Sequence, residues 1–146
     1  SGGPLIDYRG QVIGVTTAII EQAQGIGFAI PSSTAKAIGD QIISHGRPLR
    51  LGVLGGSLTP ALAQSIREQT GMELAVERGA FITRVLPDTP AEAAGLAQGD
   101  VITAVNGQEI AGMRELRDAV QQGGFGGKLQ LAFYRGASRQ QVEVTL

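Results

Sequence analysis

The chain contains no cysteine and only one histidine, His45. This excludes disulfides, thiolate metal sites, cysteine nucleophiles and histidine-rich zinc sites, and we expect neither a metal nor a cofactor. Twelve Lys and Arg against thirteen Asp and Glu leave a net charge of −1. A nearly neutral chain lacks a broad basic field for nucleic acid or an anionic membrane. No apolar run approaches the ~20 residues of a membrane-spanning helix. We therefore expect a globular protein without a nucleic acid partner.

Glycine is the abundant residue, with 22 among 146 positions. This is about twice the average usage of ~7%. The glycines follow no collagen period and lie between apolar segments, which is typical of turns and helix ends in a folded domain. Together with the many short β-branched segments, they predict a mixed, mainly β fold.

The first 46 residues contain three apolar segments and one amphipathic segment. We predict strands over 5–7, 11–19 and 25–30, and a helix capped by Ser32 or Ser33 that ends before Gly46. A block this small leaves a sheet edge and half of a core uncovered. We expect it to be the end of a larger domain. A hinge at residues 47–49 follows, because proline disfavours helical backbone in the residue before it.

Residues 50–146 have the pattern of a compact mixed domain. The expected strands cover 51–54, 80–86, 101–105, 129–133 and 142–146. The expected helices begin at Thr59-Pro60, at Thr89-Pro90 for a single turn, and at Met113. Asn106-Gly107 predicts a type I′ turn. The result is a small, partly open β-barrel with two helices.

The chain opens with Ser-Gly-Gly-Pro-Leu, residues 1–5. Glycines after a serine let backbone N–H groups face a developing oxyanion, although Ser-Gly-Gly alone is equally typical of a linker remnant. Gly-Ile-Gly-Phe-Ala-Ile-Pro follows at 25–31. With both motifs, residues 1–46 resemble the end of the trypsin-like protease domain of the HtrA (Deg) family. This resemblance implies that Ser1 is the nucleophile. It also implies that Ala18 and Ile19 line a small apolar pocket for the residue before the cleaved bond. Thr16 departs from the family, which often has asparagine there.

His45 is not expected to be a triad member. It follows the serine, whereas trypsin-like enzymes run histidine, aspartate, serine. A histidine at a predicted helix C-terminus suits the helix dipole. The sequence therefore contains at most one triad residue, and we expect the isolated chain to be inactive.

The second block contains Pro87-Asp88-Thr89-Pro90-Ala91, Gly95-Leu96, Gly99-Asp100-Val101-Ile102 and Val105-Asn106-Gly107. This set resembles the circularly permuted PDZ domain that follows the protease domain in HtrA proteins. The resemblance implies that Arg50-Leu51-Gly52-Val53 binds a peptide carboxylate through backbone N–H groups, and that the strand continuing through Leu54 pairs with the peptide. Glycine is expected because a Cβ would block the carboxylate.

A helical stripe of Met113, Leu116, Ala119 and Val120 is typical of core. By the same resemblance, Leu116 and Val120 wall the peptide groove.

The resemblance implies part of a periplasmic HtrA-like serine endopeptidase in protein quality control or stress signalling. Its PDZ domain would bind C-terminal peptides of unfolded or mislocalised proteins and thereby regulate proteolysis. It also implies a homotrimeric parent protein, while the oligomeric state of the chain itself and an inner-membrane anchor through a preceding segment are left open. The alternative is a non-catalytic peptide-binding module. A histidine and an aspartate in trypsin-like order upstream of Ser1 would distinguish the two.

Overall fold

The computed structural model describes residues 2–19 and 26–146, and it divides the chain into two compact units. We call Ser1–Pro48 the N-terminal unit and Leu49–Leu146 the C-terminal unit. The fold is mixed and mainly β, as predicted, with one sheet in each unit. No helix in the described parts of the chain is long and apolar enough to cross a membrane.

The N-terminal unit is an antiparallel sheet of order β1-β2-β3 followed by one helix. The predicted elements are confirmed: β1 (Pro4–Ile6), β2 (Val12–Ile19), β3 (Gly27–Pro31) and α1 (Ser32–His45). Gly46 ends α1 with φ +71°, as expected. The predicted serine cap is wrong. Pro31 occupies the N-cap position, so Ser32 and Ser33 lie inside the first turn and no side chain caps the helix.

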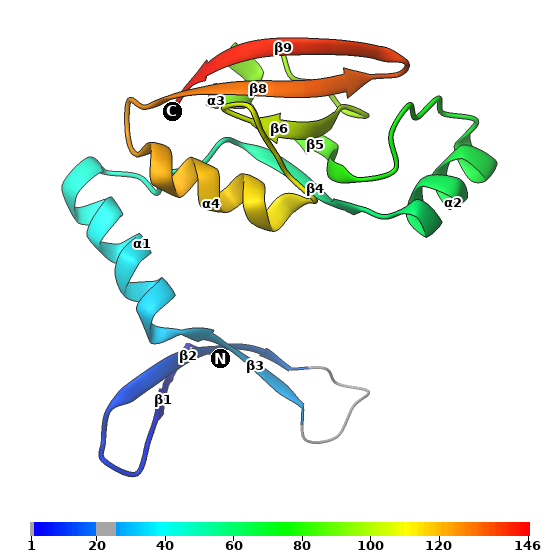
Figure 1. Ribbon diagram of the computed structural model, residues 1–146. Coiled ribbons are helices and arrows are strands. Elements are labelled where there is room, and N and C mark those ends of the chain that lie inside the picture. The colour runs from blue at the N-terminus through cyan, green and yellow to red at the C-terminus, as the bar shows by residue number, and fades with distance from the viewer. Residues whose placement is uncertain (1, 20–25) are drawn as a thin grey trace. The chain divides into compact units, whose positions relative to one another are not determined.

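The C-terminal unit contains one antiparallel sheet whose main path is β4-β5-β6-β8-β9 (Figure 1). The short strand β7 pairs with β6. Three helices accompany it. The elements are β4 (Val53–Leu58), α2 (Pro60–Thr70), β5 (Gly79–Val85), α3 (Pro90–Ala93), β6 (Val101–Val105), β7 (Gln108–Glu109), α4 (Met113–Gly123), β8 (Lys128–Arg135) and β9 (Ser138–Thr145).

Local sequence signals explain several boundaries in this unit. The Thr59 hydroxyl accepts a hydrogen bond from the Leu62 N–H at 3.3 Å, which caps α2. Asn106 and Gly107 have φ values of +51° and +79°, which fit the predicted type I′ turn between β6 and β7. The prediction of a strand over 51–54 is wrong at both ends. The strand starts only after Gly52, where φ is +94°, and continues to Leu58.

The core of the C-terminal unit forms between the sheet and α4. In-facing residues of β8 and β9 are buried, and α4 adds Leu116 and Val120 to the same cluster. In and just after the last two strands, the side chains of Leu129, Leu131, Phe133, Val144 and Leu146 are buried, and Val142 is half-buried. A smaller buried cluster under α2 contains Leu58, Ala63, Leu74 and Val101.

Candidate functional site

The segment that joins the start of the C-terminal unit to β4 forms a bend rather than a strand. Leu51 and Gly52 are buried, Val53 is half-buried, and Arg50 and Leu54 are exposed. The positive φ of Gly52 turns the backbone sharply just before β4 begins. We call residues 50–53 the glycine loop.

The carbonyl groups of the glycine loop accept hydrogen bonds that hold it in place. The Ala91 N–H donates to the Leu51 carbonyl at 2.9 Å, and the Leu86 N–H donates to the Gly52 carbonyl at 2.8 Å. Within residues 2–19 and 26–146, the N–H groups of Leu51 and Gly52 donate to no other backbone group or side chain. Because buried backbone donors are nearly always paired, two adjacent unused N–H groups on a fixed loop favour an acceptor supplied by a ligand.

The glycine loop packs against the side chain of Thr89. Its side chain is buried, and its hydroxyl donates to the Leu86 carbonyl at 2.7 Å. A Cβ added at Gly52 would lie 2.2 Å from the Thr89 Cβ. The structure therefore gives a reason for glycine that differs from the predicted one. A side chain at position 52 is excluded by the loop's own packing and positive φ, before any ligand is considered.

β4 follows the glycine loop and forms one edge of the described sheet. It pairs with β5, from Val53 opposite Val85 to Leu58 opposite Gly79. Its other edge faces α4, which contacts β4 and lies next to it in Figure 1. An edge strand presents unpaired backbone donors and acceptors, so this side of β4 is suited to pair with an added strand.

One hydrogen bond near each end of α4 connects the helix to β4 or to the residues just before the glycine loop. The Met113 N–H donates to the Ser57 Oγ at 3.0 Å, and the Gln121 Nε2 donates to the Leu49 carbonyl at 3.2 Å. Gly112 permits the first contact, since a Cβ there would lie 2.1 Å from Ser57 Oγ. These bonds set the separation between strand and helix.

Leu116 and Val120 lie in the core cluster that also contains Leu51, and they are 1% and 3% exposed. Met113 and Ala119 are partly buried against the same cluster. The stripe on α4 is thus core, as its spacing predicts. That Leu116 and Val120 also wall a groove stays a prediction.

The predicted catalytic serine, Ser1, lies outside the described residues, as does the side chain of Ile19. Ala18 is exposed on β2, opposite Phe28. Gly2 and Gly3 are held by Thr16: the Gly2 N–H donates to the Thr16 carbonyl at 2.7 Å, and the Gly3 N–H donates to the Thr16 Oγ1 at 3.1 Å. The side chain of the threonine that departs from the family pattern therefore bonds to Gly3, while Gly2 is held by the backbone at position 16.

An ion pair between a buried carboxylate and an exposed arginine holds the turn after α3 against β8. Asp100 is fully buried, and its two carboxylate oxygens accept hydrogen bonds from Arg135 Nε and Nη2, each at 2.8 Å. The hydrogen bond to Asp100 raises the pKa of Arg135. The Ala97 N–H also donates to Asp100 at 2.8 Å. All the buried side-chain polar atoms of the described residues have partners, and this pair is structural.

Sequence reasoning located the glycine loop but missed Thr89, Ser57 and Gly112. Each acts on a residue far along the chain, so no local pattern identifies it. The described residues contain no cluster of three or more His, Cys, Asp or Glu side chains that could hold a metal.

This geometry defines a class of protein. Residues 52–146 match the PDZ domain family model, and the chain belongs to that family. Over its whole length it is similar to HtrA-type serine proteases, which confirms the predicted resemblance.

Two curated relatives illustrate the similarity. The "Probable periplasmic serine protease do/HhoA-like" of Haemophilus influenzae is 38% identical over 151 residues, covering 100% of this chain and 31% of the relative. "Periplasmic serine endoprotease DegP" of Escherichia coli K12 is also 38% identical, with the same coverage. The chain spans about a third of the length of these relatives.

Two solved structures show peptide-bound neighbours. "HtrA-type protease AlgW with decapeptide" is 35% identical with a TM-score of 0.66, covering 99% of this chain and 44% of the other. The HtrA3 PDZ domain "Bound to a Phage-Derived Ligand (FGRWV)" is 25% identical with a TM-score of 0.58, covering 66% of this chain and 83% of the other.

Proposed function

We propose that the C-terminal unit binds the free carboxyl terminus of an extended peptide between β4 and α4. The observation that carries this proposal is the pair of unused N–H groups on Leu51 and Gly52, directly before an edge strand. A carboxylate accepts charge-assisted hydrogen bonds from such donors, and Arg50 adds positive charge nearby. The peptide-bound relatives support the same use of this fold.

The peptide would run antiparallel to β4, with its last residue at Val53 and its backbone bonded to the open edge beside Leu54. Strand pairing of this kind is independent of sequence. Leu51, Leu116 and Val120 are nearly fully buried, so they would contact an apolar last residue only if the groove opened on binding. The partly buried side chains of Val53, Met113 and Ala119 offer apolar surface for selectivity without such a change. We expect micromolar or weaker affinity, because ordering a flexible tail opposes binding.

The experiment compares one peptide in two forms, with a free carboxylate and with a C-terminal amide. Fluorescence anisotropy with the full chain measures both affinities. Loss of the charge-assisted bonds predicts weaker binding of the amide by roughly 10-fold or more. Equal affinity for the two forms would show that the glycine loop captures no carboxylate. Gly52→Val is unsuitable as a probe, because the added side chain collides with Thr89 whether or not a ligand binds.

For the parent protein we propose a periplasmic HtrA-like serine endopeptidase acting in protein quality control or stress signalling. The curated relatives carry periplasmic serine protease names over the same region. Ser1 would be the nucleophile, with Ala18 and Ile19 lining the pocket for the residue before the cleaved bond. Residues 1–46 would complete a protease domain, 47–49 would be the hinge through which peptide binding regulates it, and 50–146 would be the peptide-binding domain. The targets would be C-termini of unfolded or mislocalised proteins.

A homotrimeric, inner-membrane-attached parent protein is a further part of this hypothesis.

The isolated chain should not cleave casein, because a serine without its base is a weak nucleophile at neutral pH. Cleavage that persists through purification and disappears in Ser1→Ala would contradict this expectation.

A further inference from the structure

A small cavity opens where β4 ends and α4 begins. It encloses about 300 Å³ and is lined by residues that include Ser57, Leu58, Arg78, Arg114 and Glu115. We call it the exit cavity. Ser57 and Leu58 are the last residues of β4, and Arg114 lies in the first turn of α4. The exit cavity is therefore at the opposite end of β4 from the glycine loop.

This position determines which part of a bound peptide reaches it. A peptide whose last residue lies at Val53 and which runs antiparallel to β4 extends toward Leu58. β4 has six residues, and paired strands advance together at about 3.4 Å per residue. The Ser57–Met113 hydrogen bond and the packing of Gly112 against Ser57 close this edge at Ser57, so β4 would match only the last four residues of the peptide, opposite Val53–Gly56. Residues farther from the carboxyl terminus would be turned out of the groove at this contact, where the exit cavity begins.

The exit cavity presents cations without ion-pair partners. Arg78 and Arg114 are exposed, and neither forms a salt bridge or a side-chain hydrogen bond among the described residues. Glu115 contributes one negative charge to the same lining. The exit cavity is therefore positive on balance.

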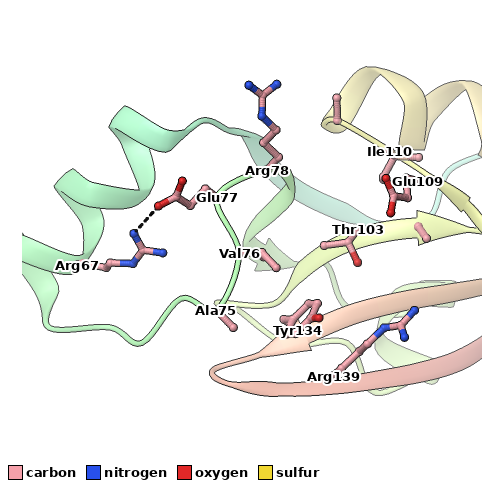
Figure 2. Close-up of a pocket in the computed structure, with 12 residues that line it drawn as sticks. Arg67, Ala75, Val76, Glu77, Arg78, Thr103, Glu109, Ile110, Tyr134 and Arg139 are labelled. Atoms are coloured by element: carbon pink, nitrogen blue, oxygen red, sulfur yellow. Dashed lines mark hydrogen bonds and ion pairs between the residues drawn. The ribbon is translucent and has the colours of Figure 1, made fainter.

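Arg78 also lines a second cavity of about 920 Å³, shown in Figure 2. There Arg67 is already engaged by Glu77 at 3.2 Å, and the Arg78 guanidinium points away from that pair. Arg139 on this cavity has no salt bridge in the described chain, and Glu109 supplies a single opposing carboxylate. Arg78 is thus shared by the two cavities, and Arg139 adds to the larger one a second arginine without an ion-pair partner among the described residues.

We propose that the exit cavity selects acidic side chains in the part of the peptide that precedes its last four residues. Arg78 and Arg114 would pair with these carboxylates, while the glycine loop holds the carboxyl terminus. The inference rests on the proposed peptide-binding function and adds a charge preference at a second contact. Arginine is suited to this task because its guanidinium donates in a planar fork to a carboxylate.

The test uses four peptides with identical last three residues. One has only these three residues, and three have ten residues with Glu, Gln or Lys at the seventh and eighth positions from the carboxyl terminus. Anisotropy titrations of the full chain at low salt should rank the long peptides Glu, Gln, Lys from tightest to weakest. Exposed ion pairs predict steps of about 2- to 5-fold, which shrink as salt is raised.

Charge reversal supplies the matching change in the protein. Arg78→Glu combined with Arg114→Glu should invert the order of the long peptides and leave the affinity for the three-residue peptide unchanged. Lys36→Glu combined with Lys128→Glu is the control, because it changes the net charge by the same amount and neither residue lines either cavity. It should keep the wild-type order, which separates local contact from net charge.

The outcomes distinguish this inference from the function beneath it. If the three-residue peptide binds and the long peptides bind equally, the exit cavity has no charge preference and the inference is wrong, while carboxylate capture stands. If no peptide with a free carboxylate binds, both the proposed peptide-binding function and the charge preference of the exit cavity are wrong. If the double variant loses the three-residue peptide, Arg78 and Arg114 act through the structure of the groove, and the proposed direct contact is wrong.

Discussion

The two units of the chain have similar apolar sequence patterns but differ in how far they bury the apolar side chains. The buried hydrophobic residues of the described chain all lie between Leu49 and Leu146, whereas α1 has no buried residue. The three strands and the helix of the N-terminal unit leave large apolar side chains exposed, among them Ile6, Phe28 and Ile43. Amphipathic periodicity therefore indicates which face of an element is apolar, but not whether the same chain supplies the surface that covers it.

This difference in burial fits the roles proposed for the two units, peptide binding for the C-terminal unit and part of a larger protease domain for the N-terminal unit. The C-terminal unit closes its own core and fixes the separation of β4 and α4 through contacts such as the Ser57–Met113 hydrogen bond. In the N-terminal unit the strands are hydrogen-bonded, and residues 2–18 and 26–48 contain no buried hydrophobic side chain. Burial of apolar surface is the dominant stabilising contribution to folding, so the stability of the two units should differ widely.

Limited proteolysis should give the largest difference. A protease without sequence preference should cleave the N-terminal unit first and leave a product that begins near residues 47–49, because cleavage follows local unfolding. Mass spectrometry of time points identifies the product. Equal lifetimes of the two units would contradict the comparison and indicate that the apolar faces of the first unit are covered, for example by a second copy of the chain.

A matched pair of isoleucine truncations measures the same contrast in free energy. Ile82 is 0% exposed and Ile43 is 85% exposed. Ile82→Ala should lower the free energy of unfolding of the C-terminal unit by about 2–5 kcal/mol, because it leaves a cavity. Ile43→Ala should change stability by no more than about 0.5 kcal/mol.

Urea titrations followed by tyrosine fluorescence in a Tyr8→Phe background report on the C-terminal unit, since Tyr134 is then the only tyrosine. Similar losses for the two variants would mean that Ile43 is buried in solution. A negligible loss for Ile82→Ala would mean that the core around β5 rearranges to fill the space.

The sequence was sufficient for elements whose signals are local. The Asn106-Gly107 turn, the alternating strands that contain Leu129 and Val144, and the Gly46 helix end all follow from short patterns. The position of the glycine loop was predicted by its similarity to a known family. Its support was not, because Thr89 lies 37 residues beyond Gly52 and meets it only in the folded chain. The start of β4 was missed for the same reason: the Leu51 carbonyl bonds to Ala91 rather than to a strand.

The smallest expected effect concerns exposed ion pairs, one in each unit. Lys128 on β8 pairs with Glu143 on β9 at 2.8 Å, and Lys36 pairs with Asp40 within α1 at 2.6 Å. The hydrogen bond from Lys128, followed by its charge, lowers the pKa of Glu143 below its ordinary value of 4.5. A carboxyl group whose pKa is lower in the folded state stabilises the fold above the unfolded pKa, and this contribution disappears as pH falls through the folded pKa.

Glu143→Gln should therefore shift the urea midpoint of the C-terminal unit slightly downward at pH 7. It should have no effect at a pH below the lowered pKa of Glu143, where wild-type Glu143 is itself neutral. The shift should also shrink in 1 M salt, since exposed charges are screened. Asp40→Asn is the counterpart in the N-terminal unit and should leave this midpoint unchanged at every pH, because α1 adds nothing to the core being unfolded. A shift for Glu143→Gln that persists in acid would identify lost packing rather than lost charge. A shift for Asp40→Asn of equal size would show that the two units unfold together, and the contrast in burial would then not be a contrast in stability.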